Sequence, residues 1–207
     1  MRVQNLARQI VSELLPFVVA GVSEIELCER VRDIGAALGS EGNWTGPTTR
    51  VGLGTLVAHP DFPMQDRRAV LGDTVIIDVN PTLNGWLGDY CVTLQIGDSP
   101  EATELIREVR EIQQLVIQSL RPGMSASSLY AEATVIFSER GLKNFDLLDN
   151  IGHSIGRDFA SGGFIDGSNE QEMWGAWTIE PQLGRNAKAA KFEDIVWLAP
   201  GQYPLVL

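Results

Sequence analysis

The amino-acid sequence predicts an α/β (α+β) fold made of two similar halves, in which a helix precedes mainly antiparallel strands. Three observations lead to this prediction. The chain has 207 residues, of which 44% are hydrophobic, as is typical of a globular domain with a full core. Two segments resemble each other at a fixed offset, and each half ends in two apolar strand-like runs joined by a turn. We therefore expect a single domain over residues 1–207, with internal halves of about 1–98 and 99–207.

The helical part of the repeat is visible in two short segments. "GVSEIEL" at residues 21–27 resembles "GMSASSL" at residues 123–129, a displacement of 102 residues. Each segment is typical of a loop followed by a serine that caps an amphipathic helix, and each helix is expected to end at a glycine. Ser23 and Glu26 also have the spacing of a capping box. The matched positions are Gly21 with Gly123, Ser23 with Ser125, Leu27 with Leu129, and Gly39 with Gly141.

Two aspartates flank the turn of the first predicted hairpin. Asp78 and Asp89 lie in apolar runs on either side of Asn84-Gly85, a dipeptide typical of a two-residue turn. Their separation of 11 residues is odd, so a hairpin with an even-numbered loop directs both side chains to one face. A two-residue turn would place Asp89 opposite Asn80, whereas a four-residue loop would place the two aspartates directly opposite each other.

The second half contains a matching pair of acids. The offset of 102 maps Asp78 onto Glu180 in "WTIEPQL", and Glu193 follows in "KFEDIVWLA". These glutamates are 13 residues apart, with a loop expected near residues 184–187, so they too should share a face. If the halves pack symmetrically, four carboxylates converge, and their repulsion would raise some of their pKa values. Divalent cations such as Mn, Fe, Co or Zn would relieve this repulsion.

A histidine completes the predicted ligand set. His153 is one of two histidines in the chain and lies between the glycines of "NIGHSIGRDF". Glycines on both sides permit close approach of the backbone. One imidazole and four carboxylates give five ligands, a number that suits a two-metal site with bridging carboxylates.

These motifs together resemble the methionine aminopeptidase, prolidase and creatinase family, whose members have the pita-bread fold. The resemblance runs from Gly21 to about Ala199 and includes the two-aspartate hairpin, "GHSIG" in place of Gly-His-Gly-Ile-Gly, "TIEP", and "FED" in place of Ile-Glu-Asp. It implies a curved, mainly antiparallel sheet with helices on its outer face and the site in its concave centre. The chain would be a short member without the N-terminal domain of prolidase-like enzymes.

The resemblance also implies a role for each candidate residue. Asp78 would bind one of two divalent metal ions, Asp89 and Glu193 would bridge both, and His153 and Glu180 would complete the other. A metal-bound hydroxide would attack a peptide-like or small amide substrate, with Glu180 as the proton acceptor. His59, which lies 19 residues before Asp78, is close to the position of a substrate-facing histidine in the family.

Three positions depart from the family pattern. A second histidine usually follows the ligand histidine by seven residues, and Ala160 stands there instead. The arginine that often precedes Glu-Asp in proline-specific members is Lys191, and an arginine common after the second aspartate is Val92. These differences favour a small or unusual substrate. They also support a second interpretation, a metal-dependent lyase or oxidative enzyme acting on a small molecule. A third, a metal-free binding module, is disfavoured by the complete ligand set.

The composition indicates which classes of partner to exclude and which cellular compartment to expect. The formal net charge is −11 and no basic face is visible, which argues against nucleic-acid binding. Two cysteines form no disulfide framework and fit a reducing cytosol. The apolar stretch at residues 14–22 is too short to span a membrane. We expect a cytoplasmic protein whose partner is a small peptide or another small molecule. A homodimer is compatible with the sequence, which contains no feature that requires one.

Overall fold

Serine-capped helices stand at the two matched positions of the repeat. The computed structural model describes residues 2–59 and 61–207. Helix α2 (Glu24–Ala37) begins at Ser23, and Ser23 and Glu26 form the predicted capping box. Helix α4 (Ala126–Glu139) begins at Ser125, whose hydroxyl accepts a hydrogen bond from the Ser128 N–H. The chain leaves these helices through Gly39 and Gly141, both at positive φ, which glycine adopts without strain.

Another helix precedes each capped helix. These are α1 (Arg2–Leu14) and α3 (Pro100–Ser119), and short 3-10 turns occupy η1 (Leu15–Phe17) and η2 (Gly52–Val57). The apolar faces of α1 and α2 pack on strands of the first half, and those of α3 and α4 pack on strands of the second. No helix within the described ranges is both long and apolar enough to cross a membrane.

The first half contains a three-stranded antiparallel sheet that ends in a tight hairpin. Its strands are β1 (Thr48–Val51), β2 (Thr74–Val79) and β5 (Tyr90–Gln95), in the order β1-β2-β5, and the hairpin adds β3 (Thr82–Leu83) and β4 (Trp86–Leu87). Asn84 and Gly85 both have positive φ, as a two-residue type I′ turn requires. The resulting register pairs Asp78 with Cys91, so the two-residue alternative is confirmed and Asp89 lies across from Asn80.

The second half repeats this plan with a longer, interrupted hairpin. Its strands are β6 (Lys143–Asn144), β7 (Gly175–Ile179), β8 (Gln182–Arg185), β9 (Lys188–Lys191), β10 (Asp194–Leu198) and β11 (Leu205–Val206), in the sheet orders β6-β8-β9 and β11-β10-β7. The turn is Asn186-Ala187, at the end of the predicted loop. Ile179 pairs with Asp194 and Gln182 with Lys191, so one register runs through both pairings and sets Glu180 opposite Glu193.

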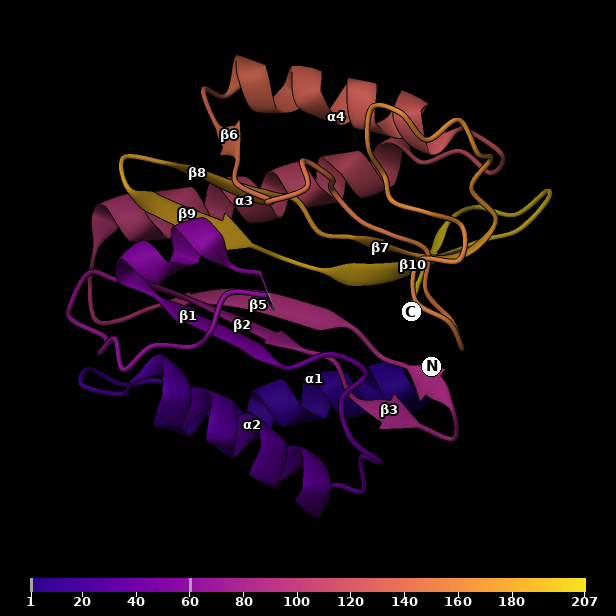
Figure 1. The fold of residues 1–207 in the computed structure, drawn as a ribbon. Helices are drawn as coiled ribbons and strands as arrows, with labels where there is room; N and C mark the ends of the chain where they lie inside the picture. Colours follow the sequence, from indigo (N-terminus) through magenta and orange to yellow (C-terminus); the bar gives the residue numbers. More distant parts are fainter. Residues whose placement is uncertain (1, 60) are drawn as a thin grey trace.

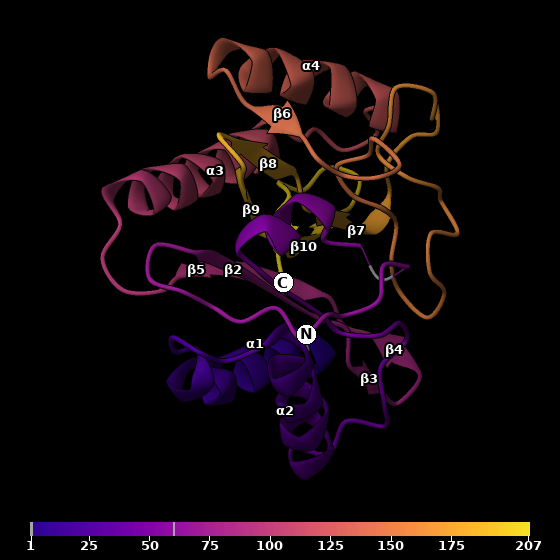
Figure 2. The same cartoon turned by 60° about the vertical axis from the view of Figure 1, so that its left-hand side comes forward.

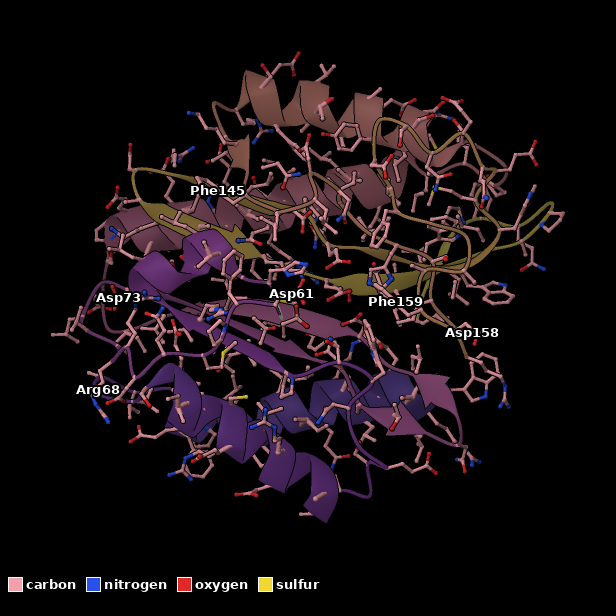
Figure 3. The ribbon with its side chains drawn as sticks, in the orientation of Figure 1. Asp61, Arg68, Asp73, Phe145, Asp158 and Phe159 are labelled. Atoms are coloured by element: carbon pink, nitrogen blue, oxygen red, sulfur yellow. The ribbon has the colours of Figure 1, made fainter. Side chains whose placement is uncertain are left out.

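The two halves face each other across their strands. Figure 1 shows α1 and α2 outside the β1-β2-β5 sheet and α3 and α4 beyond the strands of the second half, and Figure 2 shows the same layers from the side. Cys91 and Glu193 form a bridge where the halves meet. Figure 3 shows Asp61 and Phe159 in the region between the halves. The predicted α+β architecture, with strands inside and helices outside, is thus confirmed.

Candidate metal centre

The predicted ligands meet in a pocket between the two halves. The pocket has a volume of about 450 Å³, and its walls include Asp78, Asp89, His153 and Glu180. Glu193 lies beneath them with 0% of its surface exposed. The two hairpins bring the four acids together, as their odd spacings indicate, and the separate segment around His153 adds the imidazole.

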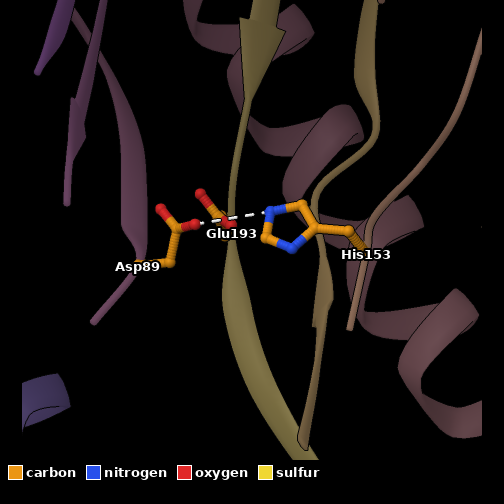
Figure 4. A group of neighbouring side chains, drawn as sticks. All are labelled: Asp89, His153 and Glu193. Atoms are coloured by element: carbon orange, nitrogen blue, oxygen red, sulfur yellow. Dashed lines mark ion pairs between the residues drawn. The ribbon is translucent and has the colours of Figure 1, made fainter. Parts of the chain in front are cut away.

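The five side chains form two groups that share Glu193. One consists of Asp89, His153 and Glu193 (Figure 4), and the other of Asp78, Glu180 and Glu193. Within each group the ligand atoms lie within 4.8 Å of one another. His153 Nε2 is 3.5 Å from Asp89 Oδ2 and 3.2 Å from Glu180 Oε1, so Glu180 also reaches the first group. Each group could hold a cation between its members.

The backbone around His153 sets the orientation of its ring. The His153 N–H donates to Thr178 Oγ1 at 3.0 Å, which ties the histidine segment to β7. His153 Nδ1 lies 3.1 Å from the Ser154 carbonyl oxygen, which can only accept a hydrogen bond. Nδ1 is therefore the donor in this contact, and Nε2 faces the carboxylates. A metal-binding histidine is commonly held in this way by a partner on its other nitrogen.

Two further side chains join the site, and the sequence did not assign them to it. Asn80 Nδ2 donates to Asp78 Oδ1 at 3.1 Å and to Asp89 Oδ1 at 2.8 Å. Lys191 Nζ lies 2.7 Å from Asp78 Oδ2, 2.6 Å from Glu180 Oε2 and 3.9 Å from Glu193 Oε2. A signal existed in the sequence, because residues two apart on a strand share a face. Asn80 follows Asp78, and Lys191 precedes Glu193, at that spacing.

The electrostatics of the site leave negative charge uncompensated. Burial and neighbouring carboxylates raise the pKa values of Asp89 and Glu193 well above their ordinary range. Burial opposes the charge of Lys191, but the attraction of Asp78 and the two glutamates outweighs it and raises the pKa of the lysine. Burial alone would raise the pKa of Glu180, but attraction to Lys191 and His153 outweighs burial and lowers this pKa. One ammonium thus stands among four carboxylates.

Glu193 provides the clearest sign that a cation fits. Both of its carboxylate oxygens are buried and have no hydrogen-bond partner among the described residues. A buried carboxylate without partners is costly unless a proton or a cation compensates it. Oxygen and imidazole donors in this arrangement suit divalent ions such as Mn, Fe, Co and Zn. The residues present therefore fit the predicted metal, and their role as ligands stays a prediction.

An aromatic wall and His59 line the rest of the pocket. The Trp44 and Phe159 rings stack at a centroid distance of 4.8 Å, and Phe159 lies 4.7 Å from the His153 ring. His59 lines the pocket with 19% of its side chain exposed, and its Nδ1 accepts a hydrogen bond from the Asp61 N–H. Ala160, which replaces the second histidine of the family, occupies a turn at φ 51° and offers the pocket no polar side chain.

The sequence is similar to those of named proteins over most of its length. The chain is 28% identical over 185 residues to a protein named probable dipeptidase PepE from Mycobacterium tuberculosis, covering 87% of this chain and 48% of that protein. It is 27% identical over 210 residues to methionine aminopeptidase A of Synechocystis, covering 94% of this chain and 81% of the relative. The chain thus spans about half the length of the dipeptidase that it matches.

The same architecture occurs in solved structures. An X-Pro aminopeptidase from Thermotoga maritima superposes with a TM-score of 0.88 at 21% identity, over 99% of this chain and 58% of that chain. At this identity the likeness shows the fold, which is the predicted pita-bread arrangement. The family model described as "Metallopeptidase family M24" matches residues 1–200 of this chain. Because this match covers nearly the whole sequence, the chain belongs to metallopeptidase family M24.

Proposed function

We propose that the protein is a metal-dependent hydrolase that cleaves a peptide-like or small amide substrate in the pocket between its halves. The observation that carries the proposal is the convergence of Asp78, Asp89, His153, Glu180 and Glu193 on one buried spot. Membership of metallopeptidase family M24 supports it. Relatives named dipeptidase and methionine aminopeptidase suggest small peptides as the substrate class.

The residues of the pocket suit separate parts of such a reaction. A divalent ion bound here would polarise a carbonyl and lower the pKa of water. Glu180 is the proposed proton acceptor, because Thr178 Oγ1 and Lys191 hold its two oxygens at 2.8 and 2.6 Å and fix the carboxylate in the pocket. His59 is proposed to contact the substrate at the pocket wall. The ring of Phe159 would exclude water from the apolar part of the pocket.

The two ligand groups correspond to the two divalent ions that the sequence predicts. They differ in one respect, because Lys191 contacts Asp78 and Glu180 in the second group. Its distance to Glu193, which belongs to both groups, is longer. The metal content of the purified protein therefore bears on both the presence and the number of ions.

Loss of a shared ligand tests the proposal directly. Protein loaded with Mn, Fe, Co or Zn should cleave members of a panel of dipeptides and aminoacyl amides. Asp89→Ala should lose bound metal and activity together, by more than the roughly 10- to 100-fold that removal of an outer partner costs. Elemental analysis and a product assay measure the two effects. Asp98→Ala, which alters an exposed aspartate after β5, is the matched control and should change neither.

Other outcomes of this experiment point to the other interpretations. Metal binding without cleavage of any panel member would favour a lyase or oxidative enzyme on the same scaffold. The alanine at position 160 is the observation that supports this alternative, because it removes a polar contact that the resemblance implies. Protein that stays empty in excess divalent ions would contradict the hydrolase proposal and leave a metal-free binding module.

The compartment and the assembly are part of the same proposal. Cys28 and Cys91 are both buried and unpaired, which supports a reducing cytoplasm. A homodimer stays a prediction, and sedimentation of the purified protein would test it.

A further inference from the structure

The second ligand group already contains a positive charge that belongs to the chain. Lys191 Nζ lies within hydrogen-bond distance of Asp78 Oδ2 and Glu180 Oε2 and 3.9 Å from Glu193 Oε2. These are the same three carboxylates that make up the group. An ion bound to those oxygens would lie beside the ammonium, and the two cations would repel each other strongly at such a distance.

Asp78 is satisfied without a metal ion. Its Oδ1 accepts a hydrogen bond from Asn80 Nδ2, and its Oδ2 faces Lys191 Nζ. Asp78 is also the residue that distinguishes the second group, since Glu193 is shared and Glu180 reaches His153. The carboxylate that would select a second ion is therefore neutralised by side chains of the same protein.

The oxygens that the first group directs toward His153 meet no ammonium, and Glu180 Oε1 accepts a hydrogen bond from the neutral Thr178 hydroxyl at 2.8 Å. Glu180 meets Lys191 through Oε2 and directs Oε1 toward His153 Nε2, while Asp89 meets Asn80 through Oδ1 and directs Oδ2 toward the same nitrogen. Both oxygens of Glu193 have no hydrogen-bond partner in residues 2–59 and 61–207. Three carboxylates and one imidazole are enough ligands for one divalent ion.

The position of Lys191 is fixed by the fold. Its N–H donates to Thr93 Oγ1 and its carbonyl oxygen accepts from the same hydroxyl, both at 2.8 Å, so β9 is held against β5. Only 9% of the side chain is exposed. A lysine ammonium is a compact point charge with rotatable donors, which lets it stand in for an ion where a planar guanidinium would not.

We propose that Lys191 serves as the second cation of this centre, so that the protein holds one divalent ion, bound by Asp89, His153, Glu180 and Glu193. The proposal rests on the metal site of the proposed function and replaces the expectation of two ions. It also assigns Asp78 to the lysine rather than to a metal.

Metal stoichiometry and electron paramagnetic resonance test the assignment. Wild-type protein loaded with Mn²⁺ and freed of excess ion should contain about one equivalent and give the six-line spectrum of an isolated ion. Lys191→Met removes the charge at similar length and should raise the content to about two equivalents with an exchange-coupled spectrum. Asp78→Asn should keep about one equivalent. Lys188→Met is the matched control, because Lys188 begins the same strand and pairs with Glu101 instead.

Each of the other outcomes would overturn the proposed role of Lys191. Two equivalents and a coupled spectrum in the wild type would overturn the role of Lys191 and leave the hydrolase proposal intact. A folded Lys191→Met variant that still binds one ion would overturn it as well. Wild-type protein that binds no Mn²⁺, Fe²⁺, Co²⁺ or Zn²⁺ would remove the metal site itself, and with it the proposed function. The wild-type measurements decide the number of ions even if the variant fails to fold.

Discussion

At the scale of single residues, Asn80 explains how two aspartates lie close together in a buried pocket. Its amide nitrogen donates to one oxygen of Asp78 and one oxygen of Asp89. Asn80 is itself buried and stands across the hairpin from Asp89, so its position follows from the two-residue turn. A neutral donor in this place reduces the repulsion between the carboxylates and orients their remaining oxygens toward different neighbours.

Replacement of Asn80 should weaken metal binding without removing a ligand. Asn80→Ala leaves two carboxylate oxygens without their donor, and loss of such a partner typically lowers metal affinity by about 10- to 100-fold. Competition against a chelator measures the affinity, and circular dichroism checks the fold. Asn5→Ala, at an exposed position of α1, is the control and should bind metal normally. Unchanged affinity in Asn80→Ala would show that the asparagine does not orient the ligands.

The acids could be predicted from the sequence, whereas the position of the lysine could not. The four acids lie in apolar runs, where a charged side chain is costly unless it has a partner. Their odd spacing across each hairpin places both members of a pair on one face of the strands. These acids are Asp78, Asp89, Glu180 and Glu193. Lys191 has the same parity as Glu193, but its long side chain can end far from its own strand. The structure brings its ammonium across to Asp78, in the other half of the molecule. That distance depends on how the halves pack, and the local pattern does not contain it.

At the scale of elements, the two hairpins differ in how clearly their turns are encoded. Asn84-Gly85 fits positive φ at both positions, so it determines the register and the face that Asp89 shares. Asn186-Ala187 makes the same kind of turn although Ala187 has a φ of 62°, which alanine rarely adopts. The second turn is imposed by the pairing of β8 with β9, and the sequence therefore predicted only a loop near it.

The segment that carries His153 should be especially sensitive to substitution. A Cβ on Gly152 would lie 2.1 Å from the Thr178 carbonyl oxygen, and Gly152 has a φ of 154°. Gly152→Ala should therefore lower the free energy of unfolding by about 3 kcal/mol or more, through overpacking and backbone strain. Gly156→Ala is the control on the same segment, because its Cβ would meet its nearest neighbour at an ordinary 4.0 Å. Chemical denaturation measures both variants, and equal stability would show that the close contact relaxes.

At the scale of the whole molecule, the site exists only where the two halves meet. The halves are joined by buried polar contacts as well as by the Cys91–Glu193 bridge. Gln182 Nε2 donates to the Thr55 carbonyl oxygen at 2.7 Å, and Thr93 bonds to both backbone groups of Lys191. Each half supplies ligands to both cation positions. Since neither half completes the site alone, we predict that residues 1–207 unfold as one cooperative domain.

Thr93→Val tests this prediction at the contact between the two halves. Valine keeps the shape of threonine but leaves the N–H and the carbonyl of Lys191 without the hydroxyl, which should cost about 1–3 kcal/mol of unfolding free energy. Far-ultraviolet circular dichroism, which follows the helices, and near-ultraviolet circular dichroism, which follows the aromatic pocket, should still report one coincident transition. Thr103→Val, at an exposed position of α3, should leave the midpoint nearly unchanged. Two separated transitions in wild type would mean that the halves are separate folding units, and the metal centre would then be lost at the first of them.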